Sequence, residues 1–227
     1  MITDYALMAP TLVREPFNRA GWAYEEKVDG WRIVAHKEGQ RVRLVSRNGV
    51  DHTRRFADIA AAVAKLSART LVLDGEVAVY DEQLRSRFEW LRDLDPAAVA
   101  TPPLLMVFDI LYRDGRDLTA RPLRDRRARL EDVVAGSELV FPVRRLAADG
   151  LAAWQQVVER GYEGYVAKDE SSSYTGGPTR RWLKVKVPGW TIGDERWTRR
   201  ISVVPSLPVI CFGAKSHRTV HQVQSAS

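Results

Sequence analysis

Residues 25–32 read Glu-Glu-Lys-Val-Asp-Gly-Trp-Arg, and the assignment of the fold starts from this stretch. A lysine among acidic residues, followed by glycine and arginine, is a candidate nucleophile that captures a nucleotide. The amine attacks only when neutral, and an unperturbed lysine has a pKa of about 10.4. Burial and nearby positive charge favour the neutral form, whereas neighbouring carboxylates oppose it. The stretch alone leaves the pKa of Lys27 open, and an ordinary lysine in a charged hairpin is the alternative.

The flanking sequence alternates between strand and helix patterns. Strands are predicted at residues 22–26, 31–36, 42–46, 71–80, 104–111, 165–168 and 182–187. Helices are predicted at residues 51–66, 122–134 and 151–160. Gly75 lies inside a predicted strand, which marks close approach of another backbone or a ligand. The strands are close-set and joined by hairpins, so the pattern favours an α+β fold over a doubly wound parallel sheet.

Composition indicates a globular protein with a basic balance. The chain has 227 residues, of which 45% are hydrophobic and 28% charged, and its formal net charge is +6. This charge favours a polyanionic partner such as nucleic acid. Cys211 is the only cysteine, which excludes an intrachain disulfide. The N-terminus lacks a signal-peptide pattern and no apolar run has the length of a membrane span, so we expect a cytoplasmic protein that does not act at membranes.

Further segments complete a set of motifs. They are Ser46-Arg47-Asn48-Gly49, Leu73-Asp74-Gly75-Glu76, Val107-Phe108-Asp109, Glu-Gly-Tyr-Val-Ala-Lys at 163–168 and Trp-Leu-Lys-Val-Lys at 182–186. Together with residues 25–32 they resemble, in order and spacing, the motifs of the adenylation domain of ATP-dependent DNA ligases. The resemblance covers residues 5–190. The opening Met-Ala-Pro-Thr-Leu at 8–12 resembles the start of bacterial ligase domains of the end-joining type.

The resemblance implies a nucleotidyltransferase fold, with two mainly antiparallel sheets flanked by helices and a nucleotide pocket between them. It also implies a reaction in three steps. A lysine attacks the α-phosphate of ATP and forms lysyl-AMP with release of pyrophosphate. AMP then passes to the 5′-phosphate of a nick, and the 3′-hydroxyl displaces AMP and seals the strand. Such an enzyme acts in DNA repair, recombination and end joining.

Catalytic and metal-binding roles follow from the same resemblance. Lys27 is the predicted nucleophile, and Lys184 and Lys186 are predicted to neutralise the α-phosphate. Glu163 is predicted to hold Mg²⁺ (or Mn²⁺), and Glu76 to bind ribose or assist the metal, because this ion prefers carboxylate oxygen and water. Taken singly, the two lysines fit a solvated strand edge and the two glutamates fit turns. The joint occurrence of the motifs favours the catalytic interpretation.

Besides Glu76, five residues are predicted to bind the nucleotide. Glu25 is predicted to recognise the adenine edge, and Phe108 to stack on the base, for which an aromatic face is a natural platform. Arg32 is predicted to contact the nucleotide or the nick phosphate, and Arg47 and Lys168 to contact phosphate. Taken alone, Phe108 fits a core position and Arg47 a turn. Three aspartates near the motifs have no evident chemical role and are expected to shape turns: Asp29, Asp74 and Asp109.

The C-terminal part departs from the family pattern. Family ligases continue with an OB-fold domain that carries a sixth, basic motif, and residues 191–227 are too few for a five-stranded barrel. We expect residues 1–190 to form the adenylation domain and residues 191–227 a basic, partly disordered tail with no OB-fold. Self-adenylation is then expected to be slow or absent. In the tail, Arg196, Arg199 and Arg200 fit phosphate contacts and a solvated surface equally well.

The expected partner is nicked double-stranded DNA at the bacterial nucleoid. A separate OB-fold protein would supply the domain that the tail lacks, and the end-joining resemblance implies a Ku-like DNA-end-binding protein as a partner. Two alternative functions remain open from the residues. One is an RNA ligase or capping-type nucleotidyltransferase, which uses the same Lys-X-Asp-Gly pattern. The other is a non-catalytic module that binds nicks or nucleotide within a repair complex.

Overall fold

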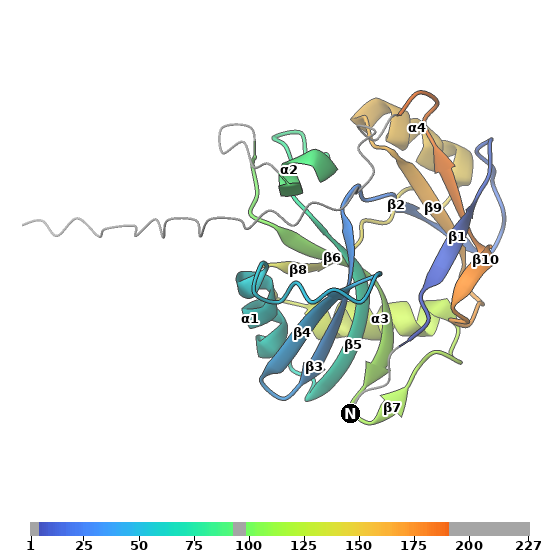
Figure 1. Cartoon of the computed structure of the whole chain (residues 1–227). Coiled ribbons are helices and arrows are strands. Elements are labelled where there is room, and N and C mark those ends of the chain that lie inside the picture. Colours follow the sequence, from blue (N-terminus) through green and yellow to red (C-terminus); the bar gives the residue numbers. More distant parts are fainter. Residues whose placement is uncertain (1–4, 93–98, 191–227) are drawn as a thin grey trace, which may run out of the picture. The chain divides into compact units, whose positions relative to one another are not determined.

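Two β-sheets pack against each other in the computed structural model, which describes residues 5–92 and 99–190 (Figure 1). The predictions for residues 191–227, including the absence of an OB-fold and the roles of the three tail arginines, lie outside the described residues.

The smaller sheet has four strands in the order β1-β10-β9-β2. Their bounds are β1 (Met8–Leu12), β2 (Trp22–Glu26), β9 (Gly164–Asp169) and β10 (Gly177–Lys186). The β1–β10 pair is parallel and the other two pairs are antiparallel. Strands β2, β9 and β10 therefore bring three of the predicted motifs side by side, although they are far apart in the sequence.

The larger sheet has six strands, with β4-β3-β5-β6-β7 in order and β8 beside β6. Their bounds are β3 (Trp31–Glu38), β4 (Arg41–Ser46), β5 (Thr70–Ala78), β6 (Leu104–Arg113), β7 (Arg116–Asp117) and β8 (Val140–Pro142). All pairs are antiparallel except β6–β8. A Cβ on Gly75 would lie 2.7 Å from Met106 O, so the predicted close approach of a backbone is confirmed.

A cluster of apolar side chains joins the two sheets. Met8 of β1 and Trp182 of β10 belong to the smaller sheet. They pack in one buried cluster with residues of the larger sheet, Val34, Val72 and Leu111. Burial of this apolar surface is the main force that holds the sheets together.

Helices cover the outer faces of the sheets. Their bounds are α1 (Ala57–Lys65), α2 (Phe88–Arg92), α3 (Leu123–Val134) and α4 (Gly150–Arg160). Helix α1 packs on β3 and β4, α3 on β6 and β8, and α4 on β9 and β2. Asp149 caps α4 by accepting bonds from two backbone N–H groups, and Gly161 ends it at φ +66°, a conformation that favours glycine.

The predicted strands and helices are present, with shifted ends. Helix α1 begins at Ala57 rather than at residue 51, because Thr53 Oγ1 and the N–H of His52 bond to the backbone of Leu44 and tie this segment to β4. Strand β10 begins at residue 177, before the predicted 182. Four short elements were not predicted: β1, β7, β8 and α2.

Candidate active site

Lys27 lies in the connection between β2 and β3, against the start of β9. Its N–H donates to the carbonyl of Gly164 at 3.0 Å. Its Nζ donates to Glu163 Oε2 at 2.6 Å, while Lys186 Nζ lies 2.7 Å from Glu163 Oε1. The side chain of Glu163 is fully buried. One carboxylate therefore holds both the predicted nucleophile and a predicted phosphate-binding lysine.

The charges around Lys27 decide its protonation. Burial lowers its pKa, but the carboxylates of Glu163, Glu76 and Asp29 outweigh this effect and raise it. Lys27 is therefore a cation in this state. For Lys184 the balance is opposite, because burial and the charges of Lys27 and Lys186 lower its pKa. A negatively charged phosphate would relieve this crowding of lysines.

Glu76 and Glu163 form the predicted metal-binding pair. Burial raises the pKa of Glu76 to about 7, and the nearby charges of Glu163 and Asp29 act in the same direction. Burial likewise raises the pKa of Asp29 to about 6, followed by the charge of Glu163. A cation among these carboxylates would relieve their repulsion. Mg²⁺ is commonly bound by one or two carboxylates with substrate phosphates and water, so these residues fit the ion.

The predicted base-binding residues meet at the other side of the site. Lys168 Nζ lies 4.6 Å from the centroid of the Phe108 ring and 4.3 Å from that of Trp182. It also lies 2.6 Å from Glu25 Oε2. The structure thus places Lys168 with Glu25 and Phe108, while Lys27 and Lys186 gather on Glu163.

Arg32 is held by residues that the sequence did not indicate. It donates to both carboxylate oxygens of Asp74, with Nε to Oδ1 at 3.0 Å and Nη2 to Oδ2 at 2.7 Å. Tyr174 Oη donates to Asp74 Oδ2 at 2.6 Å and accepts from the N–H of Met8 at 3.0 Å. The guanidinium carbon of Arg32 lies 5.3 Å from the Phe108 ring centroid. Arg32 therefore borders the base-binding side of the site.

Most predicted residues line one cavity of about 210 Å³. They are Glu25, Lys27, Arg32, Arg47, Glu76, Phe108, Lys168 and Lys184. The remaining two, Glu163 and Lys186, join the cavity through the ion pair with Lys27. The cavity is lined by residues of both sheets, including Lys184 of β10 and Glu76 of β5, so the predicted pocket between the sheets is present.

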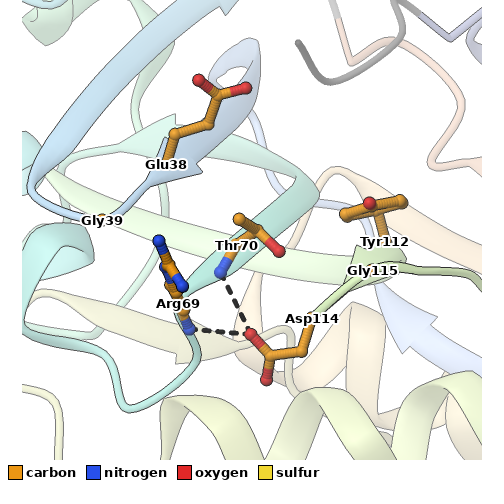
Figure 2. A pocket seen from close by; sticks show the side chains of 7 residues that line it. All are labelled: Glu38, Gly39, Arg69, Thr70, Tyr112, Asp114 and Gly115. Atoms are coloured by element: carbon orange, nitrogen blue, oxygen red, sulfur yellow. Dashed lines mark hydrogen bonds between the residues drawn. The ribbon is translucent and has the colours of Figure 1, made fainter.

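A larger, open hollow of about 640 Å³ lies at the other end of β3 (Figure 2). None of the predicted site residues lines it. Figure 2 shows Asp114 among its lining residues, where Oδ1 accepts the N–H groups of Arg69 at 2.8 Å and Thr70 at 3.1 Å. The carboxylate of Asp114 therefore holds the turn after β6 against the start of β5, so its role is structural.

Several residues that lie outside the cavity lining but fix its surroundings were not predicted from the sequence. The expectation that Asp74 and Asp109 shape turns is wrong, because they lie in β5 and β6 and form ion pairs with Arg32 and Arg126. Tyr174 was missed as well. The local sequence indicated a role for Asp74 and Asp109 only through their position beside a motif residue, because the arginine partners of both aspartates are distant in the sequence.

Comparisons with known proteins agree with this geometry. The sequence model of the family described as ATP dependent DNA ligase domain matches residues 7–186. The multifunctional non-homologous end joining protein LigD of Pseudomonas aeruginosa is 36% identical over 179 residues, which cover 78% of this chain and 21% of that protein. DNA ligase 1 of Methanosarcina acetivorans is 35% identical over 189 residues, which cover 72% of this chain and 32% of that protein.

A solved structure shows the same fold. Mycobacterial DNA ligase D, complexed with ATP and MES, superposes with a TM-score of 0.69 at 31% identity, covering 80% of this chain and 60% of that one. The predicted α+β nucleotidyltransferase fold is confirmed. The chain spans about a third or less of the length of the two relatives named above. No helix within residues 5–92 and 99–190 is long and apolar enough to cross a membrane.

Proposed function

The chain belongs to the family of ATP-dependent DNA ligases, and from this premise we propose that it forms a lysyl-AMP on Lys27 and seals nicked DNA. The observation that carries the proposal is the ion pair of Lys27 with Glu163, 2.6 Å long, at a cavity between the sheets. The lysines, arginines, glutamates and Phe108 around that cavity match the needs of a bound adenine nucleotide. ATP is the nucleotide of this family.

The first step joins the lysine to the α-phosphorus of ATP. The ammonium group of Lys27 first gives up one proton. The neutral amine then forms an N–P bond while the bond to the pyrophosphate oxygen breaks, and pyrophosphate leaves as the nitrogen loses its second proton to solvent. Glu163 Oε2 accepts the Nζ–H bond at 2.6 Å, so this carboxylate is placed to take the first of these protons. Lys184 and Lys186 lie beside it and stabilise the charge that develops on the phosphate.

The residues of the site also fit a divalent cation. Glu76 and Glu163 would hold Mg²⁺ (or Mn²⁺), which supplies positive charge to the phosphates. Glu163 holds Lys27 and Lys186 on its two oxygens in the described state. Loading of the nucleotide therefore requires the ion pair of Lys27 to loosen before the amine can attack.

The later steps would act on nicked double-stranded DNA, in repair by end joining at the bacterial nucleoid. The relatives named as DNA ligases favour this substrate over RNA ends and over a capping reaction. The net charge of +6 suits a polyanionic substrate. A separate OB-fold protein or a Ku-like end-binding protein belongs to the same proposal as a partner.

Covalent labelling tests the first step. The protein is incubated with α-labelled ATP and Mg²⁺ for long enough to detect slow self-adenylation and then denatured, and label is expected to remain on the chain. Lys27→Ala should abolish it, whereas Lys65→Ala, which removes an exposed lysine of α1, should not. Label that persists in Lys27→Ala would contradict the assignment of the nucleophile.

Sealing is tested separately with nicked, pre-adenylated DNA. Joining of this substrate is expected in wild type. If neither label nor joining appears, the enzymatic proposal fails and a non-catalytic binding module is favoured. Stronger labelling with GTP than with ATP would favour the capping-type alternative.

A further inference from the structure

The carboxylate of Glu25 is held from two sides by buried cations. Arg127 of α3 donates from Nη1 to Oε1 at 2.7 Å, and Lys168 of β9 places Nζ 2.6 Å from Oε2. The side chains of all three residues are 2–3% exposed. Glu25 itself lines the cavity that also contains Phe108. The carboxylate that faces the base-binding side is therefore fixed before any nucleotide binds.

Arg127 is itself immobilised. Its Nε donates to Glu131 Oε1 at 2.9 Å, and its Nη2 donates to the carbonyl of Val143. The neighbouring Arg126 is equally buried but turns to Asp109, with bonds of 2.7 and 2.8 Å to the two carboxylate oxygens. The two adjacent arginines of α3 thus bind different carboxylates. Of these two carboxylates, only Glu25, the partner of Arg127, lines the nucleotide cavity.

Ionised Glu25 can only accept hydrogen bonds. A carboxylate has about four acceptor positions, so the two ion pairs leave capacity for a nucleotide. The exocyclic amino group of adenine is a donor, whereas guanine carries a carbonyl oxygen at the equivalent position. At this position of the ring, a fixed acceptor-only group favours the amino group of adenine and repels the carbonyl oxygen of guanine, whose own donors lie elsewhere on the base.

We propose that Arg127 is a positioning residue that keeps Glu25 as an ionised acceptor and thereby sets the preference for adenine over guanine nucleotides. The proposal rests on the proposed function, in that the cavity binds a nucleotide whose base lies at Phe108. Arg127 does not line the cavity, so it acts through Glu25.

The electrostatics around Glu25 agree with this role. Burial alone would raise its pKa, but the charges of Lys168, Arg127 and Arg145 outweigh burial and lower it. These three cations come from β9, from α3 and from the segment that bridges β2 at Glu25. Without the charge of Arg127, Glu25 binds a proton at higher pH. The protonated carboxyl then has an O–H donor, which suits the carbonyl of guanine.

Equilibrium binding of AMP and GMP, measured by calorimetry across the pH range, tests the proposal without requiring the covalent step. Wild type is expected to prefer AMP. Arg127→Met should lower the ratio of GMP to AMP dissociation constants by about tenfold or more, and the loss should grow as the pH falls. The matched control is Arg126→Met, which removes an equally buried arginine of the same helix and should leave the ratio unchanged.

A second variant keeps the proposal testable if Arg127→Met does not fold. In Glu25→Gln/Arg127→Met both members of the buried pair are neutral, so no buried carboxylate loses its counter-ion. Glu131, which also loses Arg127, is about half exposed and stays solvated. Glu25→Gln alone should lower the ratio, and adding Arg127→Met should lower it no further. An unchanged ratio in folded Arg127→Met, an equal loss in Arg126→Met, or a further loss in the double variant would overturn the proposal.

Labelling of the same variants with α-labelled ATP separates this proposal from the proposed function. If wild type binds AMP selectively through Arg127 but forms no covalent adduct, the ligase chemistry fails and the role of Arg127 stands. If wild type forms the adduct and Arg127→Met keeps the full preference for ATP, the role of Arg127 fails and the ligase chemistry stands.

Discussion

Replacement of Tyr174 by phenylalanine removes one hydroxyl that fastens the two sheets together. Its Oη donates to Asp74 of β5 at 2.6 Å and accepts from the N–H of Met8 of β1 at 3.0 Å. The first bond reaches the larger sheet and the second reaches the smaller one. Tyr174→Phe leaves Asp74 with Arg32 alone and leaves the buried N–H of Met8 without its acceptor.

These two bonds set the expected size of the effect, because the third bond of the hydroxyl, accepted from Arg32 Nη2, is long at 3.4 Å. A hydrogen bond to a charged group contributes about 1.5–3 kcal/mol, and a buried N–H left without a partner costs about 1–3 kcal/mol. We therefore expect Tyr174→Phe to lower the free energy of unfolding by about 3 kcal/mol or more. For a domain of this size, that loss lowers the Tm by roughly 6–12 °C.

Tyr80→Phe is the matched control. Tyr80 and Tyr174 are 4% and 6% exposed, but the hydroxyl of Tyr80 has no hydrogen-bond partner among the described residues. Its removal should change stability by less than about 0.5 kcal/mol or stabilise the protein. Urea denaturation of both variants measures the difference. Equal losses, or no loss in Tyr174→Phe, would refute the view that this hydroxyl holds the sheets.

Three further predictions concern the site and its surroundings. Burial raises the pKa of Glu26 to about 7 in the folded protein. The neutral carboxyl therefore contributes stability that is fully present below the pKa of the unfolded chain and is lost as the pH rises through the folded pKa of about 7. In urea denaturation, the stability of Glu26→Gln relative to wild type should therefore grow by up to about 3 kcal/mol between low pH and about pH 8, and a constant difference would count against this pKa. Glu163→Gln removes the carboxylate that raises the pKa of Lys27, so modification of Lys27 by an amine-specific reagent should reach its midpoint at lower pH; an unmoved midpoint contradicts the ion pair. Gly164→Ala would place a Cβ 2.0 Å from Val185 O, so it should cost about 1–3 kcal/mol or more and impair adenylation, and a variant of wild-type stability would argue against this strand pairing.

The motifs were sufficient to predict which residues gather at the cavity. Each motif places its polar residue on or beside a strand, and the family order fixes which strands become neighbours. Lys27, Glu163 and Lys186 meet because β2, β9 and β10 are adjacent, which the sequence of any single motif does not reveal. Their predicted chemical roles remain predictions.

The supporting residues could not be predicted in the same way. Arg127 is 102 residues from Glu25, and Tyr174 is 100 residues from Asp74. Helical spacing does place Arg127 on the face of Leu123 and Leu130, whereas Arg129 lies outside that face, but the spacing does not identify Glu25 as the partner of the buried guanidinium. Partners at such separations follow from tertiary packing rather than from periodicity or turn signals.

Lys168 illustrates the limit of motif reasoning. Its motif suggested a phosphate contact, yet its ammonium group lies against Phe108 and Trp182 and pairs with Glu25. The side-chain direction is set by the register of β9 with β10, in which Lys168 faces Trp182. A one-residue change of register would have turned it to the other face.

The role of Lys27 as nucleophile is tested most directly by the mass of the peptide that contains it after incubation with ATP and Mg²⁺. This peptide should gain the mass of one AMP through an acid-labile bond to Lys27, and added pyrophosphate should remove it. AMP on another lysine, or neither an adduct nor sealing of pre-adenylated nicked DNA by a chain that binds AMP, would contradict the claim that Lys27 is the nucleophile of an adenylating enzyme.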